Sequence, residues 1–194
     1  MPPPADTRAR AYCRGVTLLE LLVVLFILAL LLTQAAGSWS GLLRSSRADA
    51  TIYQLQRLIY RARSQAISSG DIVSLCAYSP GGCGNNYEQG LMLFSDRNNN
   101  GLVDDDDRLL EVMYLELHGG ELLWRASGGR NYLRYSPNGA ARQFGRFHLC
   151  PVDADLRYAR SLVINRQGRV RVYRDRDGDG IVEDTSGAIP LCEN

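Results

Sequence analysis

Apolar residues concentrate in one run near the start of the chain. Every position of residues 21–32 is apolar, and residues 16–36 include only four polar side chains, Thr17, Glu20, Thr33 and Gln34. A helix of roughly 20 apolar residues crosses a bilayer core of about 30 Å. Arginines precede the run, so we expect the N-terminus to remain cytoplasmic. The pattern predicts a membrane-spanning helix over residues 16–36, in which the carboxylate of Glu20 needs a partner.

A second apolar pattern follows with helical spacing. Apolar residues recur at steps of three and four, at Ile52, Leu55, Ile59, Ala62 and Ala66. This spacing is typical of a helix with one buried stripe. Three arginines, Arg57, Arg61 and Arg63, fall outside the stripe, and we expect them on a solvated face. We predict one helix from residue 16 to about residue 69, whose amphipathic half, residues 37–70, packs on a domain.

From residue 71 the pattern changes to short apolar runs separated by turn residues. Such runs, bounded by glycine, proline and asparagine, predict β-strands. The predicted strands are residues 72–76, 90–94, 109–117, 120–124, 132–135, 145–150, 161–164 and 169–173. Residues 71–194 are therefore expected to form a β-rich globular domain with a C-terminal tail. A long N-terminal helix packed on antiparallel β-sheet is an α+β fold.

The segment that opens the apolar run has a specific sequence. Residues 15–20 read GVTLLE, which resembles the class III signal of type IV pilins and type II secretion pseudopilins. The resemblance implies that prepilin peptidase removes a cytoplasmic leader, residues 1–15, by cleavage between Gly15 and Val16. It also implies methylation of the new N-terminus. The first mature residue is usually phenylalanine in this family, and here it is valine. An ordinary signal anchor is the alternative.

The same resemblance gives Glu20 a partner. In the family, the glutamate at the fifth mature position pairs with the N-terminal amine of a neighbouring subunit during filament assembly. A buried charge that is paired is far less unfavourable than a lone one. The implied location is the inner membrane, with a single pass and a periplasmic domain, and then the pilus on the cell surface. The implied partners are other pilins and minor pilins.

Later segments narrow the resemblance to one branch. The sequences FSDRN at residues 94–98, YSPNG at residues 135–139 and FHLC at residues 147–150 are similar to the GspH/FimT branch of minor pilins, and most like its FimT members. These matches are short, whereas the N-terminal signature is tight. The resemblance implies a type IV pilin-like fold for the whole mature chain.

Charge and cysteine content bound the function further. All 22 basic residues are arginine; without the leader, 22 − 3 = 19 arginines face 21 − 1 = 20 acids. Any contact with nucleic acid must therefore come from a local patch.

Four cysteines follow the leader, at Cys76, Cys83, Cys150 and Cys192. An even number beyond a membrane anchor favours disulfides in an oxidising periplasm. Pairing of Cys76 with Cys83 and of Cys150 with Cys192 is expected, although four cysteines allow three connectivities.

One short motif points to DNA. Residues 165–171 read NRQGRVR and resemble the GRxR element with which FimT-type minor pilins bind DNA in natural transformation. The resemblance implies that Gly168, Arg169 and Arg171 form a site for double-stranded DNA. The apolar runs around the motif predict a hairpin, and strand alternation places Arg169 and Arg171 on one face. Arg166 at the turn tip is a further candidate, and Tyr173 is the only nearby aromatic residue.

A structural role is the alternative function. A planar guanidinium suits phosphate, but arginine is the only basic residue in the chain, and a solvated strand would carry arginines in any case. On this interpretation the chain is a minor pilin, or a type II secretion pseudopilin, that primes or caps a filament without binding DNA.

Two acidic loops have the spacing of calcium ligands. The first loop offers Asp96, Asn98, Asn100, Asp104 and Asp107, and the second offers Asp175, Asp177, Asp179 and Glu183. Oxygen ligands around a central glycine are typical of EF-hand loops. However, an aspartate and a serine replace the glutamate at the twelfth position of the two loops, and turns rich in Asp and Asn also occur without metal. Calcium is thus a candidate ligand, and no cofactor is required.

Catalytic chemistry is not indicated. His118 and His148 are the only histidines, and neither has the spacing of a metal site or a catalytic triad. The sequence has no glycine-rich phosphate loop and no carboxylate pair tied to a nucleophile. We therefore do not expect an enzyme.

Overall fold

The computed structural model describes residues 15–80, 82–184, 186–190 and 192, without the side chains of residues 33–38. The predicted leader, apart from Gly15, lies outside the described residues. The chain divides into two compact parts, Met1–Leu42 and Leu43–Asn194, and each is considered by itself below.

Helix α1 spans Leu18–Ser69, 52 residues, which confirms the predicted long N-terminal helix. The Thr17 Oγ1 accepts a hydrogen bond from the backbone N–H of Glu20 at 3.2 Å. This is the geometry of an N-cap with a glutamate at the third helical position. At the other end, Gly70 has a φ of 74°, and its N–H bonds to the carbonyl of Ala66 at 3.1 Å. A glycine in the left-handed conformation is a common helix terminator.

The first sheet contains five antiparallel strands. Strand β1 lies at its centre and pairs with β3 on one side and with both β2 and β6 on the other, and β4 pairs with β3. The bounds are β1 Val73–Ser79, β2 Gly82–Gly84, β3 Leu91–Ser95, β4 Arg108–Met113 and β6 Tyr132–Tyr135. The sequence did not predict β2, because three residues of glycine and cysteine carry no apolar alternation.

The second sheet contains four antiparallel strands in the order β5-β7-β8-β9. Their bounds are β5 Glu121–Ala126, β7 Gly145–Cys150, β8 Arg160–Ile164 and β9 Val170–Val172. All eight predicted strands are present; two of them, residues 132–135 and 145–150, have the predicted ends, and the ends of the others differ by at most four residues. Two 3-10 turns, η1 Tyr87–Gln89 and η2 Leu156–Tyr158, complete the second part.

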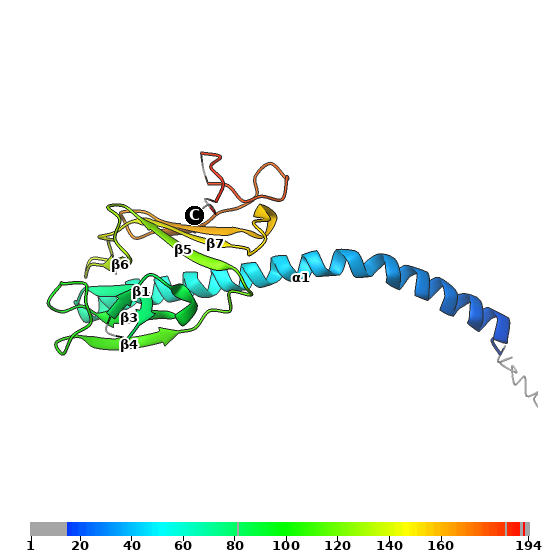
Figure 1. Ribbon diagram of the computed structural model, residues 1–194, viewed down its shortest axis with the longest axis horizontal. Coiled ribbons are helices and arrows are strands. Elements are labelled where there is room, and N and C mark those ends of the chain that lie inside the picture. Colours follow the sequence, from blue (N-terminus) through cyan, green and yellow to red (C-terminus); the bar gives the residue numbers. More distant parts are fainter. Residues whose placement is uncertain (1–14, 81, 185, 191, 193–194) are drawn as a thin grey trace, which may run out of the picture. The chain divides into compact units, whose positions relative to one another are not determined.

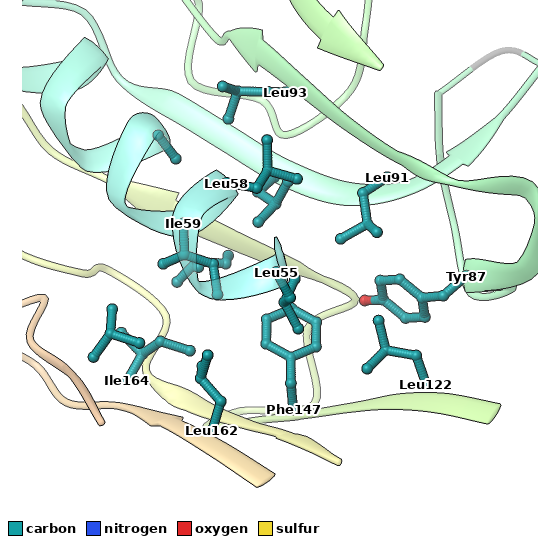
Figure 2. Packing of buried hydrophobic residues seen from close by; sticks show 14 of the residues in the cluster. Leu55, Leu58, Ile59, Tyr87, Leu91, Leu93, Leu122, Phe147, Leu162 and Ile164 are labelled. Carbon is teal, nitrogen blue, oxygen red and sulfur yellow. The ribbon is translucent and has the colours of Figure 1, made fainter. Parts of the chain in front are cut away.

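The two sheets lie on opposite sides of the second half of α1, drawn in cyan in Figure 1. The predicted apolar stripe is buried along its whole length, with Ile52, Leu55, Ile59, Ala62 and Ala66 each at most 1% exposed. Figure 2 shows Leu55 and Ile59 between Leu93 of the first sheet and Phe147 of the second. Both sheets therefore share one core with the helix.

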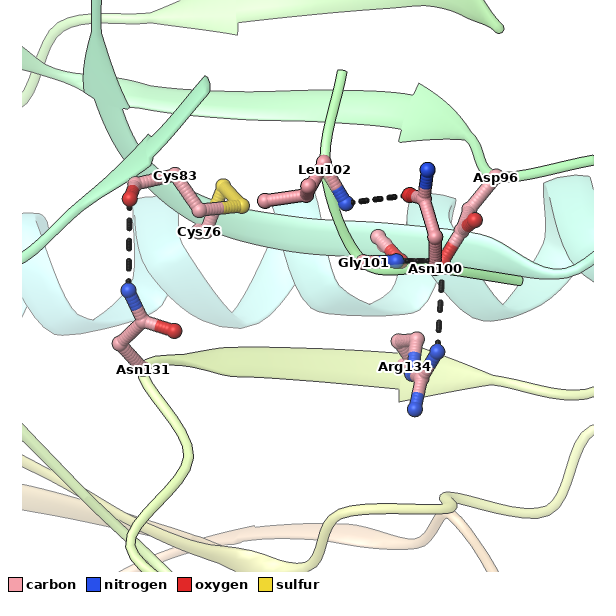
Figure 3. The surroundings of a disulfide bond; sticks show 9 residues. Cys76, Cys83, Asp96, Asn100, Gly101, Leu102, Asn131 and Arg134 are labelled. Atoms are coloured by element: carbon pink, nitrogen blue, oxygen red, sulfur yellow. Dashed lines mark hydrogen bonds and ion pairs between the residues drawn. A yellow bond between two sulfur atoms is a disulfide. The ribbon is translucent and has the colours of Figure 1, made fainter. Parts of the chain in front are cut away.

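Two disulfides cross-link the second part of the chain, Leu43–Asn194. Cys76 is bonded to Cys83 across the β1–β2 turn, and Cys150 at the end of β7 is bonded to Cys192. This is the pairing that the sequence favours among the three alternatives. Figure 3 shows that Asn131 donates a hydrogen bond to the carbonyl of Cys83, at 3.3 Å.

Candidate functional site

The predicted hairpin is formed by β8 and β9. Ile164 pairs with Val170 and Val163 with Arg171. The turn closes because Asn165 accepts at its side-chain oxygen from the N–H of Arg169, at 2.9 Å. Arg169 and Arg171 are exposed, whereas Val170 is buried. The predicted alternation of the hairpin is therefore present.

Gly168 has a structural role in this turn. Its φ is 75°, which favours glycine. A Cβ atom on Gly168 would lie 2.2 Å from the carbonyl oxygen of Gly139 and 2.8 Å from the ring of Tyr135. The Tyr135 hydroxyl donates to the carbonyl of Gly168 at 3.3 Å. Because Gly168 is buried, its part in the site is to let the turn approach the β6–β7 loop and so hold the two arginines that follow.

Helix α1 fastens the same turn. The Nε of Arg63 donates to the carbonyl of Gly139 at 2.9 Å, and its Nη2 donates to the carbonyl of Gln167 at 3.2 Å. The expectation that Arg63 lies on a solvated face is therefore wrong, because its half-buried side chain binds two backbone carbonyls. Arg61 pairs with Glu111, whereas Arg57 is exposed as expected.

Arginines from three strands lie in one row across the second sheet. Arg125 of β5 is opposite Arg146 of β7, Arg146 is opposite Val163 of β8, and Val163 is opposite Arg171 of β9. Neighbouring strands are about 4.8 Å apart. Phe147, next to Arg146, is in the core, so the row lies on the outer side of the sheet. We call this side the arginine face and define it by Arg125, Arg146, Arg166, Arg169 and Arg171.

The arginine face carries both free and paired side chains. Within the described part of the chain, the side chains of Arg169 and Arg171 have no hydrogen bond or ion pair. Arg146 forms an ion pair with Asp184 at 3.2 Å. The pKa of Asp184 falls to about 2, because Ser186 and the N–H of Ala188 donate hydrogen bonds to its carboxylate. A groove of about 390 Å³ lies beside these residues.

This groove mixes charges of both signs. Five arginines and two acids line it: Arg146, Arg169, Arg171, Arg174, Arg176, Glu183 and Asp184. Tyr173, the aromatic residue that the sequence singles out, is 5% exposed and donates to Asp184 at 3.4 Å. It is therefore not available as a stacking platform.

Sequence reasoning missed Arg125 and Arg146. Arg146 lies in a predicted strand next to the buried Phe147, and Arg125 directly follows the predicted strand 120–124, next to the half-buried Trp124. That alternation could have placed both on an outer face. The order of the strands, which brings them beside Arg171, is set by long-range pairing that no local pattern contains.

The two acidic loops differ in geometry. In the second loop, carboxylate oxygens of Asp175, Asp177, Asp179 and Glu183 lie within 4.8 Å of one another. The N–H of Gly180 bonds to Asp175 at 2.9 Å, which curls the loop around this point.

In the first loop most of the candidate ligand oxygens accept hydrogen bonds from other groups. The Asp96 carboxylate is fully buried and accepts from Ser74, from the N–H of Gly101 and from Arg134, partly drawn in Figure 3. Asp104 accepts from the amides of Asn98 and Asn100, both at 2.7 Å. Asp107 accepts from the N–H of Arg97 at 2.9 Å. The hydrogen bonds to Asp96 all reach its Oδ2, whereas its Oδ1 is buried and has no hydrogen bond within the described residues.

The first part of the chain presents an apolar surface. Every large apolar side chain from residue 16 to residue 32 is exposed, with Leu18 at 82% and Val23, the lowest, at 45%. Glu20 is also exposed, and nothing lies within 4 Å of the position a Cβ on Gly15 would take. A continuous apolar surface of this kind marks an interaction surface.

No helix among the described residues is both long enough and apolar enough to cross a membrane.

Two protein family models match the chain. The family model of the type II transport protein GspH matches residues 51–168, and that of the prokaryotic N-terminal methylation motif matches residues 10–33. No curated protein matches the sequence significantly.

Solved structures of pilins resemble the fold. The minor pilin FimU of Pseudomonas aeruginosa matches with a TM-score of 0.50 and 17% identity, over 66% of this chain and 90% of FimU. The minor pseudopilin EpsH of the Vibrio cholerae type 2 secretion system matches with a TM-score of 0.48 and 12% identity, over 65% of this chain and 95% of EpsH.

The methylation motif is the substrate of prepilin peptidase, and it implies a membrane-anchored subunit that enters a pilus. Proteins of this kind interact with other pilins and are structural, not enzymatic, components. The GspH model covers more than half of the chain, so the chain belongs to the GspH family and is a minor pilin or pseudopilin of the type IV class.

Proposed function

We propose that this chain is a minor type IV pilin that binds double-stranded DNA through its arginine face and takes part in DNA uptake. The observation that carries the proposal is the row of Arg125, Arg146 and Arg171 across three strands. Together with Arg169 and Arg166, these residues gather positive charge from β5, β7 and the β8–β9 hairpin. Guanidinium groups bind phosphate oxygens in pairs, and such contacts give affinity that does not depend on base sequence.

The N-terminal segment would anchor the chain and then join it to the filament. Prepilin peptidase is proposed to cleave between Gly15 and Val16, which leaves Glu20 at the fifth mature position. The exposed apolar surface of residues 16–32 would then lie in the inner membrane before assembly and against other subunits afterwards. The exposed carboxylate of Glu20 would pair with the N-terminal amine of a neighbour. In this way the filament carries the arginine face out of the membrane.

Calcium at the second acidic loop is the second element of the proposal. Four carboxylates that converge within 4.8 Å repel one another unless a cation lies between them. Oxygen ligands at this density suit calcium. The loop begins four residues after Arg171, so a bound cation would offset negative charge that otherwise opposes phosphate. Calcium is thus expected to strengthen DNA binding.

The decisive experiment measures DNA binding by residues 43–194, which contain the whole buried core and both disulfides. Fluorescence anisotropy with a labelled 20-base-pair duplex is recorded from low to physiological salt. The R169Q/R171Q variant is expected to lose at least tenfold in affinity at low salt. Its slope of log K against log salt should fall by about two, one for each phosphate contact.

A matched control removes the same charge elsewhere. The R57Q/R108Q variant loses two exposed arginines, one on α1 and one on β4, and should bind like the wild type. Circular dichroism confirms that each variant is folded. If the wild type does not bind duplex DNA at low salt, the DNA proposal is wrong.

The second candidate function is structural, and the exposed apolar surface of residues 16–32 favours it. That surface would serve assembly whether or not DNA is bound. On this alternative the chain primes or caps a type IV pilus or a type II secretion pseudopilus. A strain in which the R169Q/R171Q protein restores filament assembly but not DNA uptake would separate the two functions.

A further inference from the structure

A pocket of about 560 Å³ lies in the middle of the arginine face, beside the hairpin. Its walls come from three strands and two turns. Phe144, Gly145, Val163 and Ala126 are among its apolar lining residues, and Arg125, Arg146 and Arg166 are among its charged ones. A pocket of this size, apolar inside and charged at its edge, is typical of a small-molecule site.

An aromatic ring stands in the wall of the pocket. Phe144 precedes β7 and is half-buried. Its backbone carbonyl accepts from the N–H of Ser127 at 2.8 Å, which fixes its position beside β5. The guanidinium of Arg166 lies 5.3 Å from the centre of the ring. Because the guanidinium lies over the ring, the two form a cation–π pair on which a third flat group can stack.

Two polar groups in the pocket remain without partners within the described part of the chain. The Nδ1 of His148 lies 2.6 Å from the Oγ of Ser161, but its Nε2 is buried and has no hydrogen bond. Asn165 uses its side-chain oxygen for the N–H of Arg169, which leaves its amide nitrogen as a donor. Asn165 is exposed, whereas the His148 Nε2 is buried, and an unpartnered buried polar atom is rare and calls for an explanation.

We infer that this pocket receives an unpaired nucleobase of a DNA strand whose phosphates lie on the arginine face. The inference rests on the proposed DNA binding and deepens it. Recognition of single strands combines a positive groove along the backbone with an aromatic platform for the bases. The arginine face supplies the first and Phe144 the second. Bases of an intact duplex are stacked inside the helix and cannot reach such a pocket, so only single-stranded or frayed DNA gains this contact in addition to the phosphate contacts.

The experiment uses the full chain in detergent and three labelled probes of equal length. These are a 15-mer of thymidylate, a 15-base-pair duplex and a 15-mer of abasic residues, which has the phosphates but no bases. The thymidylate probe is expected to bind about 5- to 150-fold more tightly than the abasic probe, the range that stacking of one base produces. The duplex, whose bases cannot enter the pocket, measures binding through phosphates alone.

A variant tests the ring itself. F144L keeps apolar bulk and removes the aromatic face, so it should lower the affinity for thymidylate to that of the abasic probe and leave duplex affinity within twofold. If the wild type binds thymidylate and abasic probes equally, the base pocket is wrong while DNA binding stands. If no probe binds at low salt, the proposed function fails with it. The probe comparison uses wild-type protein, so it holds even if F144L does not fold.

Discussion

The backbone of Gly168 lies against Gly139, so that a Cβ atom on Gly168 would be 2.2 Å from the Gly139 carbonyl oxygen. Two turns, one from the β8–β9 hairpin and one from the β6–β7 loop, meet at this point. The approach is too close for any side chain. The glycine of the arginine motif is therefore fixed by packing, and the arginines beside it are positioned as a result.

The first prediction follows from this contact. G168A should destabilise the second part by several kcal/mol, because the new methyl group clashes with backbone and the positive φ is strained. G128A is the matched control. Gly128 has a φ of 82° but nothing within 4 Å of its Cβ position, so its substitution should cost only about 1 kcal/mol for the conformation. Urea unfolding measures both, and equal losses would show that the contact with Gly139 is unimportant.

Arg63 provides the second prediction. R63Q removes both hydrogen bonds to the turns, one part-buried and one exposed. It should lower the free energy of unfolding by about 1–3 kcal/mol, since two carbonyls lose a charged donor. R57Q, on an exposed side of the same helix, should have little effect. Amide hydrogen exchange gives a second measurement, with faster exchange expected at Gly168 and Arg169 in R63Q. Unchanged amide protection at Gly168 and Arg169 would show that Arg63 does not hold this turn in place.

Helical and strand periodicity predicted most of this fold. The stripe from Ile52 to Ala66 is buried because each member recurs at helical spacing, and the strands were found because their apolar residues alternate. Periodicity does not show which distant segments come together in the fold. Arg63 falls outside the apolar stripe, so its position suggests solvent, and its two acceptors come from turns about 76 and 104 residues away. The row of Arg125 and Arg146 beside Arg171 was missed for the same reason.

The acidic loops illustrate a second limit of sequence. Both have the spacing of calcium ligands, yet in the first loop the Asp96 carboxylate is fully buried beside Arg134. Spacing alone does not show which oxygens already have donors. In the second loop, Asp175 and its neighbours converge.

The third prediction concerns this second loop. Millimolar calcium should raise the melting temperature of the wild-type protein by several degrees, as expected for a ligand that binds only the folded state. Removal of calcium with a chelator should weaken duplex binding. D177N/D179N should abolish both effects, whereas D105N/D106N, which changes two exposed acids of the first loop, should not. If calcium changes neither the melting temperature nor the DNA affinity, the second loop is not a calcium site.

His148 gives a prediction of pH dependence. Burial lowers its pKa to about 4, helped by the positive charges of Arg146 and Arg125. In the unfolded chain its pKa is about 6.5. The unfolded state therefore binds more protons between pH 6.5 and 4, and stability should fall as the pH drops through this range. The loss is up to roughly 3 kcal/mol. Chemical unfolding at pH 7 and pH 4.5 measures it, and H148Q should lack this component.

The disulfides provide the fifth prediction. Cys150 and Cys192 are 42 residues apart and Cys76 and Cys83 only 7. In the chain-entropy model, closing the longer loop stabilises by about 4 kcal/mol and closing the shorter one by about 2.5 kcal/mol. C150S/C192S should therefore lose more stability than C76S/C83S. Urea unfolding of the two double variants tests the order, and the reverse order would mean that local packing outweighs loop length.

The position of α1 between two sheets has a kinetic consequence. The helix segment from Ile52 to Ala66 contributes to a core that also contains Phe147 and Leu162, about a hundred residues later in the chain. Folding must close this long loop before most apolar contacts can form, and domains with such distant contacts fold slowly. During synthesis, the apolar stripe of the helix therefore waits exposed until the last strands are made. Such an exposed stripe makes the incomplete chain prone to aggregation during this interval.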